Sequence, residues 1–170
     1  MERLQSILAA HPGVRPGGLE LEVLETSALE DIALVSQVIE DCAQIGVKFA
    51  LDDFGTGYSS LTYLRRLGVS MLKIDQSFVR DVIGDPDDIA ILQGVIGLAA
   101  AFKHEVIAEG VETVAHGTLL LQLGCELAQG YGIAGPMPPE QMPAWAATWQ
   151  PYAAWCAVPG SEETFRSTDK

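Results

Sequence analysis

The sequence is poor in basic residues: ten Lys and Arg stand against 23 Asp and Glu, a formal net charge of −13 over 170 residues. No run of Lys and Arg interrupts this excess of acid, so binding of polymeric nucleic acid is disfavoured, because phosphate contacts need clustered cations. A small phosphate ester remains possible as a ligand if metal ions neutralise the charge on both sides.

Cysteines and long apolar runs are also scarce. Cys42, Cys125 and Cys156 are far apart and form no Cys-x-x-Cys pair, which favours a reduced, cytoplasmic setting. The start, Met1–Leu4, lacks the pattern of a secretory signal. The longest apolar stretch, residues 89–102, is too short to span a bilayer, so we expect a buried helix and no membrane segment.

Two nucleotide-binding motifs are missing. There is no Gly-x-x-x-x-Gly-Lys-Ser/Thr loop and no Gly-x-Gly-x-x-Gly after a strand-like run, which argues against triphosphate and dinucleotide folds. The histidines His11, His104 and His116 have no ligand spacing, and we expect all three at the surface. Metal binding should therefore use oxygen ligands, which favours Mg²⁺ or Mn²⁺ over zinc.

What the chain does contain is an alternation of strand-like and helix-like segments. Strands are predicted at residues 19–24, 47–51, 70–74, 105–108 and, more weakly, 127–133. Helices are predicted at residues 27–45, 87–102 and 111–123, and one short helix before a Pro/Gly-rich turn within residues 1–16. This order without hairpin signals predicts a parallel α/β sheet with right-handed crossovers.

Polar residues recur at the ends of these predicted strands: Glu22, Asp52 and Asp53, Lys73 and Asp75, Glu109, and Gln129. In a closed (β/α) barrel the strand ends converge on one mouth, where active sites of that fold lie, whereas an open sheet would spread them along an edge. A barrel needs eight strands and about 250 residues, so five βα units would form an incomplete one. We assign residues 1–150 to this partial domain and residues 151–170 to a C-terminal linker or tail.

Asp52 and Asp53 leave an apolar strand into a Gly-rich turn. On a regular extended strand both cannot point the same way, so one should face the barrel axis while the other lies on the rim or turns with the loop. Such a pair can hold two ions, or one ion and its water. Lys73 lies between apolar Leu72 and Ile74, so its side chain should enter the barrel and meet Asp52 or Glu109, either for catalysis or as a structural ion pair.

Taken together, the ordered segments resemble the EAL domain, the family of cyclic di-GMP phosphodiesterases with a (β/α)8 TIM-like barrel. The segments that carry the resemblance, within about Leu19 to Pro138, are Glu22–Glu25, Asp52–Leu61, Lys73–Asp75, Ala108–Glu112 and Gln129–Tyr131. The resemblance implies hydrolysis of cyclic di-GMP to linear pGpG in bacterial second-messenger signalling. It also implies a homodimer and a sensory or diguanylate cyclase domain in the full-length protein.

The resemblance further implies a role for each site residue. Two Mg²⁺ or Mn²⁺ ions would be held by Glu22, Asp52, Asp53 and Glu109, with Asp52 bridging them. Lys73 would position the attacking water and, with Asp53, contact the substrate. Glu109 would bind or polarise that water, and Gln129 would orient the site near it.

Three further residues would support the site. Glu25 would anchor the loop at residues 54–60, which in the family couples the site to dimer contacts. Asp75 and Glu112 would support the ligands from outside the metal shell.

Some features depart from the family pattern. No Glu-Ala-Leu motif precedes Leu19, and the early Asn that completes the family's metal site is absent. Leu24 stands where Thr is usual, and Gly135 replaces a commonly basic residue. We therefore expect the full-length protein to be the phosphodiesterase and this chain alone to be inactive.

Two alternatives remain open. A catalytically degenerate EAL module would bind cyclic di-GMP or mediate dimerisation without chemistry, although costly charges at a barrel mouth argue against decay. A metal-dependent barrel of the enolase type also carries acids on successive strands and a lysine base, but gives no role to the segment Gly55–Leu61.

Overall fold

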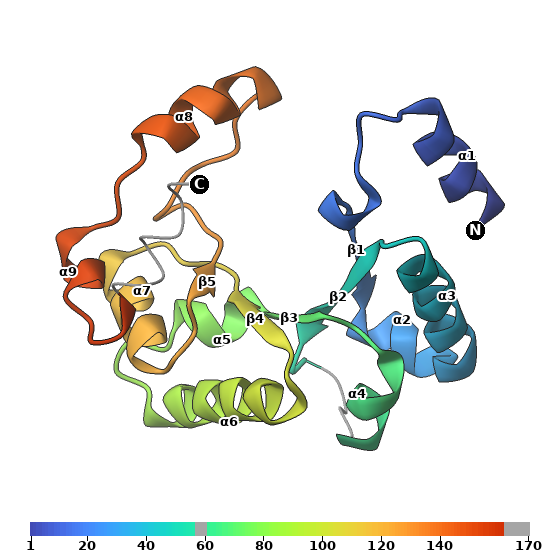
Figure 1. Cartoon of the computed structure of the whole chain (residues 1–170). Helices are drawn as coiled ribbons and strands as arrows, with labels where there is room; N and C mark the ends of the chain where they lie inside the picture. Colours follow the sequence, from blue (N-terminus) through green and yellow to red (C-terminus); the bar gives the residue numbers. More distant parts are fainter. Residues whose placement is uncertain (57–60, 162–170) are drawn as a thin grey trace. The chain divides into compact units, whose positions relative to one another are not determined.

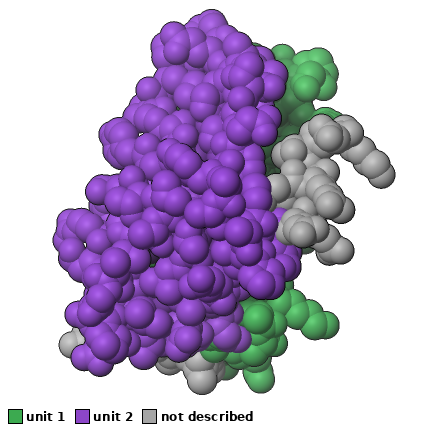
Figure 2. Space-filling model, turned by 90° about the vertical axis from the view of Figure 1, so that its left-hand side faces the viewer, with its two compact units in different colours: residues 1–75, 98–105 green, residues 76–97, 106–170 purple. Residues whose placement is uncertain are grey.

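The computed structural model describes residues 1–56 and 61–161, with only the backbone for residues 61–63. The chain divides into two compact units, coloured separately in Figure 2. The first comprises residues 1–75 and 98–105, and the second comprises residues 76–97 and 106–170.

The first unit contains three strands in parallel pairs: β1 (Glu20–Leu24) beside β2 (Lys48–Phe54), and β2 beside β3 (Met71–Ile74). Its other elements are α1 (Glu2–Ala10), the 3-10 turn η1 (Pro16–Gly18), α2 (Glu25–Glu30), α3 (Ile32–Gln44) and α4 (Leu61–Leu67) (Figure 1). Helices connect successive parallel strands, as the predicted crossovers require.

The centre of β2 is buried on both faces. Phe49, Ala50 and Leu51 are consecutive, and each is at most 8% exposed. Helix α3 contributes buried Ile39 and Cys42 to the same unit. A continuous apolar run of this kind is typical of a parallel strand covered by other elements on both sides. The run ends at Leu51, and the polar residues of β2 begin directly after it with Asp52.

The helix predicted for residues 27–45 is in fact two helices, divided at Asp31. Asp31 has φ −146°, and its Oδ1 accepts a hydrogen bond of 2.9 Å from the backbone N–H of Leu34. Asp31 is therefore the N-cap of α3. Its side chain pairs with a backbone donor that would otherwise lack a partner at a helix start, which favours a new helix at this point over one continuous helix.

Asp31→Ala should lower the free energy of unfolding by about 1 kcal/mol, because the Leu34 N–H loses its cap. Urea denaturation measures the change. Glu40→Ala, at an exposed position within α3, is the matched control and should alter stability by less than about 0.5 kcal/mol. Equal effects of the two substitutions would contradict the capping role.

The second unit contains β4 (Glu105–Ala108) and β5 (Leu127–Ala128), which pair in parallel with Ile107 opposite Leu127. Its helices are α5 (Gln76–Arg80), most of α6 (Pro86–Phe102), α7 (Val114–Gln122), the 3-10 turn η2 (Pro139–Gln141), α8 (Met142–Thr148) and α9 (Ala153–Cys156). Helix α7 begins three residues later than predicted, because Thr113 caps its N-terminus by accepting a hydrogen bond from the His116 N–H.

Residues 151–161 include α9, whose Trp155 is 4% exposed. The rest of the predicted tail, residues 162–170, lies outside the described residues, so the division at residue 150 stays a prediction. Within the described part of the chain, no helix has the length and apolarity needed to cross a membrane.

Candidate functional site

Lys73 is the centre of an ion-pair cluster that joins three neighbouring strands of the first unit. Its Nζ lies 2.8 Å from Oε1 of Glu22 on β1 and 2.8 Å from Oδ1 of Asp52 on β2. The Lys73 side chain is 8% exposed, and that of Asp52 is 19% exposed. An ammonium group this buried needs opposite charge beside it, and the ion pair expected between Lys73 and Asp52 is present.

A β-bulge at the end of β2 brings the two aspartates to the same side of the strand. Leu51 pairs with Leu72 and Phe54 pairs with Ile74, so Asp52 and Asp53 together oppose a single residue of β3. Asp53 has φ +55°, a left-handed conformation that Asp tolerates better than most residues.

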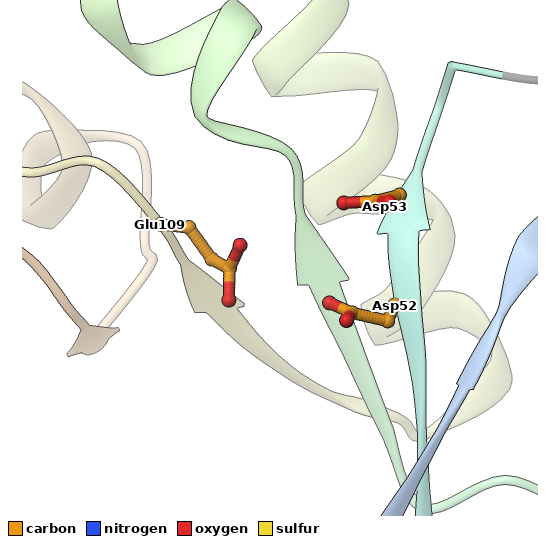
Figure 3. Close-up of side chains that lie close together, drawn as sticks. All are labelled: Asp52, Asp53 and Glu109. Atoms are coloured by element: carbon orange, nitrogen blue, oxygen red, sulfur yellow. The ribbon is translucent and has the colours of Figure 1, made fainter.

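Figure 3 shows both aspartate side chains extending from one side of β2. One carboxylate oxygen of Asp52 lies within 4.8 Å of one from Asp53. The expectation that the pair must diverge holds for a regular strand, and it was wrong here because an extra residue re-aims a side chain.

The oxygens of this pair fit a hard divalent cation. Oδ1 of Asp52 is buried and, within the part of the chain that the structure describes, makes no well-directed hydrogen bond, although Lys73 Nζ is near. Burial raises the pKa of the Asp53 carboxyl, and the negative charges of Asp52 and Asp75 raise it further, while Lys73 lowers it. A cation bound between such carboxylates would offset the negative charge that Lys73 alone does not balance. Mg²⁺ and Mn²⁺ prefer oxygen ligands of this kind.

Glu25 connects the start of α2 to the turn that follows β2. Its side chain is completely buried, and its Oε2 accepts a hydrogen bond of 3.0 Å from the backbone N–H of Gly55. Gly55 has φ +101°, a conformation that glycine adopts without strain. The anchoring contact implied for the loop at residues 54–60 is thus present at its first turn, while residues 57–60 lie outside the described residues.

Glu25→Ala should lower the free energy of unfolding by about 1–3 kcal/mol, because the Gly55 N–H loses a charged acceptor. Glu25→Gln keeps an acceptor oxygen at the same place and should cost less. Denaturant unfolding and amide exchange at Gly55 measure both variants, and equally fast exchange at Gly55 in the two would contradict the anchoring role.

In the second unit, two segments with predicted site residues are joined through their backbones. Gln129 N–H donates to Ala108 O at 2.8 Å, and Val111 N–H donates to Gln129 O at 3.0 Å. Glu109 directly follows β4 and is half-buried, while Glu112 and Gln129 are exposed. Figure 3 shows Glu109 at the end of its strand.

Glycines make the close approach of these segments possible. A Cβ on Gly130 would lie 2.3 Å from Val111 O, and one on Gly132 would lie 2.7 Å from the carbonyl carbon of Glu112. Both neighbours are backbone atoms that cannot move aside, so only glycine fits. Gly130 belongs to the motif Gln129–Tyr131, but its packing role was not predicted, since its contact partners lie about 20 residues earlier.

The prediction that all three histidines are at the surface was wrong for His116, which is 6% exposed. Its Nδ1 accepts a hydrogen bond of 3.3 Å from the Glu112 N–H. His104 is half-buried, and burial lowers the pKa of its imidazole. His11 is exposed as expected.

The predicted site residues therefore form two groups. In the first unit the structure brings together Glu22, Asp52, Asp53, Lys73 and Asp75, with Glu25 beneath the following turn. In the second unit it brings together the segments that carry Glu109, Glu112 and Gln129. Apart from Glu22, at the centre of β1, these residues lie near or just after the carboxyl ends of parallel strands, where ligands of α/β proteins bind.

Comparison with known proteins identifies the family. The family model described as EAL domain matches residues 1–136, so the match begins earlier than the predicted Leu19. The chain therefore belongs to the EAL domain family, and the resemblance of its motifs is confirmed. Membership also removes the enolase-type alternative.

Among curated relatives, a cyclic di-GMP phosphodiesterase of Pseudomonas aeruginosa, PA2567, is 46% identical over 127 residues, which are 75% of this chain and 22% of the relative. MucR of the same organism, named a bifunctional diguanylate cyclase/cyclic di-GMP phosphodiesterase, is 40% identical over 84% of this chain and 21% of its own length. The chain thus spans about a fifth of these relatives.

Solved structures show the same fold. The MucR phosphodiesterase in complex with cyclic di-GMP has a TM-score of 0.79 and 40% identity, covering 83% of this chain and 57% of that one. The EAL domain of Mycobacterium smegmatis DcpA has a TM-score of 0.80 and 38% identity, covering 88% of this chain and 66% of that one. The predicted fold class, an α/β chain that forms part of an EAL-type barrel, is confirmed.

Proposed function

We propose that this chain carries most of the catalytic groups of a metal-dependent phosphodiesterase that hydrolyses cyclic di-GMP to linear pGpG. The observation that carries the proposal is the Lys73 cluster: an ammonium group held between Glu22 and Asp52 with Asp53 beside them. Such an arrangement has anionic oxygens that can hold a metal ion. It also has a positive charge that can stabilise the negative charge developing on a phosphodiester during hydrolysis. Two relatives at 46% and 43% identity, named cyclic di-GMP phosphodiesterases, support the choice of substrate.

Mg²⁺ or Mn²⁺ is the proposed cofactor, and the carboxylates of Glu22, Asp52, Asp53 and Glu109 would hold it. A solved relative, BlrP1 of Klebsiella pneumoniae, is a manganese and cyclic di-GMP complex at 35% identity. When bound, such ions lower the pKa of a water molecule and polarise a phosphoryl oxygen. The buried, poorly hydrogen-bonded Oδ1 of Asp52 suits this role.

The side chains of this chain would handle charge and protons during hydrolysis. Water adds to phosphorus, one bridging P–O bond breaks, and the proton of the water finally resides on the oxygen that leaves. Glu109 would accept the proton from water, and Lys73 would stabilise the negative charge that develops on the phosphoryl group. Gln129 would orient the water, and Asp53 together with Lys73 would contact the substrate.

The remaining predicted residues would position these groups. The Glu112 N–H donates a hydrogen bond to His116. The negative charge of Asp75 raises the pKa of the Asp53 carboxyl. Glu25 would hold the loop at residues 54–60 near the site. The full-length protein is also proposed to be a cytoplasmic homodimer. A sensory or cyclase domain in it is proposed because MucR is named as both a diguanylate cyclase and a cyclic di-GMP phosphodiesterase.

Calorimetric titration of cyclic di-GMP into this chain, with and without Mn²⁺, tests the binding part of the proposal. Turnover is tested in the chain extended at its N-terminus by the corresponding part of the solved MucR domain. We expect Mn²⁺-dependent formation of pGpG by the extended chain, and no turnover by residues 1–170 alone, since this chain spans 57% of the MucR chain.

The two results separate the possible functions. Metal-dependent binding without turnover in the extended chain would contradict the catalytic proposal and favour the degenerate EAL module. Turnover by residues 1–170 alone, abolished by Asp52→Asn, would contradict the expectation that further barrel segments are required.

A further inference from the structure

Helix α9 lies beyond the residues that match the family and packs on α7 within the second unit (Figure 1). Its Trp155 is 4% exposed. The indole Nε1–H donates a hydrogen bond of 2.9 Å to the backbone oxygen of Val114, the first residue of α7. A residue 41 positions away thus contributes to the first turn of that helix.

The Trp155 ring fits against α7 because residue 117 is glycine. A Cβ at Gly117 would lie 2.5 Å from Cε2 of the indole, which is too close for two carbon atoms that are not bonded to each other. The turn after α9 is fixed as well, since buried Ser161 donates its Oγ–H to Trp155 O and Val158 O, both at 2.7 Å. The backbone of Trp155 is therefore held by its own segment, and its ring is held by α7.

The first turn of α7 is in turn bonded to the segment that carries the predicted site residues. Thr113 Oγ1 accepts from the His116 N–H at 3.2 Å, and His116 Nδ1 accepts from the Glu112 N–H at 3.3 Å. The next residue towards the strand, Val111, donates its N–H to Gln129 O. These hydrogen bonds link Trp155, through the first turn of α7, to the backbone of Glu112. The neighbouring Val111 is bonded in the same way to the backbone of Gln129.

We propose that Trp155 is a positioning residue for the segment Glu109–Glu112. By fixing Val114 and the packing at Gly117, it holds the first turn of α7, and through His116 it holds the backbone of Glu112. The C-terminal segment is then part of the functional unit. The consequence for catalysis rests on the proposed function, whereas the structural coupling does not.

Trp155→Phe tests the coupling, because it keeps an aromatic ring and removes the N–H donor. Trp149→Phe, at the half-buried residue that directly follows α8, is the matched control. Amide hydrogen exchange under native conditions is followed by mass spectrometry across both variants. We expect exchange at residues 111–116 to rise about five- to tenfold in Trp155→Phe, corresponding to the loss of one hydrogen bond, with residues 89–97 of α6 unchanged.

Gly117→Ala provides a second test that leaves Trp155 itself intact. The added methyl should displace the ring and raise exchange at the same residues, 111–116. A uniform rise over the whole unit in both variants, or no rise at residues 111–116, would overturn the proposal, because general loss of packing would then explain the data.

Kinetics of the N-terminally extended chain distinguish the catalytic consequence. Trp155→Phe should lower kcat for cyclic di-GMP about tenfold while KM stays within about twofold, because displaced active groups affect the chemical step more than binding. Changed exchange with unchanged kcat would overturn the positioning role while leaving the proposed function intact. An inactive extended wild type would count against the proposed function, and the exchange data would still decide the coupling.

Discussion

Asp52→Asn is expected to lower cyclic di-GMP turnover by the N-terminally extended chain at least about 10³-fold, because loss of the outer partners of a metal ligand alone costs about 10–100-fold. The substitution keeps the shape of the side chain and removes the charge of the buried oxygen beside Lys73. Lys73 retains Glu22 at 2.8 Å, so the fold should persist. Initial rates at saturating Mn²⁺ measure the effect.

The matched control for this substitution is Asp87→Asn, at an exposed position in the first turn of α6. It makes the same chemical change outside the cluster and should leave turnover within about twofold. If Asp52→Asn kept a tenth or more of the wild-type rate, Asp52 would not be a ligand of the catalytic ions.

Lys73→Met should destabilise the chain without metal and increase its stabilisation by Mn²⁺. Without metal, the free energy of unfolding should fall by about 1–3 kcal/mol, because Glu22 and Asp52 lose their counter-charge but are partly exposed to solvent. With Mn²⁺, the rise in Tm should exceed that of the wild type, because the carboxylates no longer share a protein cation and bind the metal more tightly. Turnover by the extended chain should be lost.

Thermal unfolding of this chain with and without Mn²⁺ measures the stability change. Lys48→Met, which removes an exposed lysine at the start of β2, should change neither stability nor the response to Mn²⁺ appreciably. A Tm rise in Lys73→Met that is no larger than in the wild type would indicate that Mn²⁺ binds away from the Lys73 cluster.

The strands were predictable because parallel strands are buried and therefore apolar over several residues. The predicted range 105–108 is the observed β4, and 70–74 differs from β3 by one residue. The bulge in β2 was not predictable, since alternation of side chains assumes a regular strand. Only the pairing with β3 reveals that Asp52 and Asp53 oppose one residue.

The candidate site was predictable to the extent that its residues lie at strand ends. Lys73 shows this well, because its two apolar neighbours fix the direction of its side chain. Contacts distant in sequence had no comparable signal: nothing in the sequence links Trp155 to Val114, or Gly130 to Val111. The burial of His116 was missed for the same reason, since its partner is the backbone of Glu112.

The proposed hydrolysis requires a divalent cation at the aspartate pair of β2, and diffraction from crystals of the N-terminally extended chain grown with Mn²⁺ would locate that cation. Anomalous scattering identifies manganese independently of any assay. We predict an anomalous peak within bonding distance of an Asp52 carboxylate oxygen, and its absence in Asp52→Asn. A peak elsewhere, or none at Mn²⁺ concentrations that support turnover, would contradict the proposed metal site.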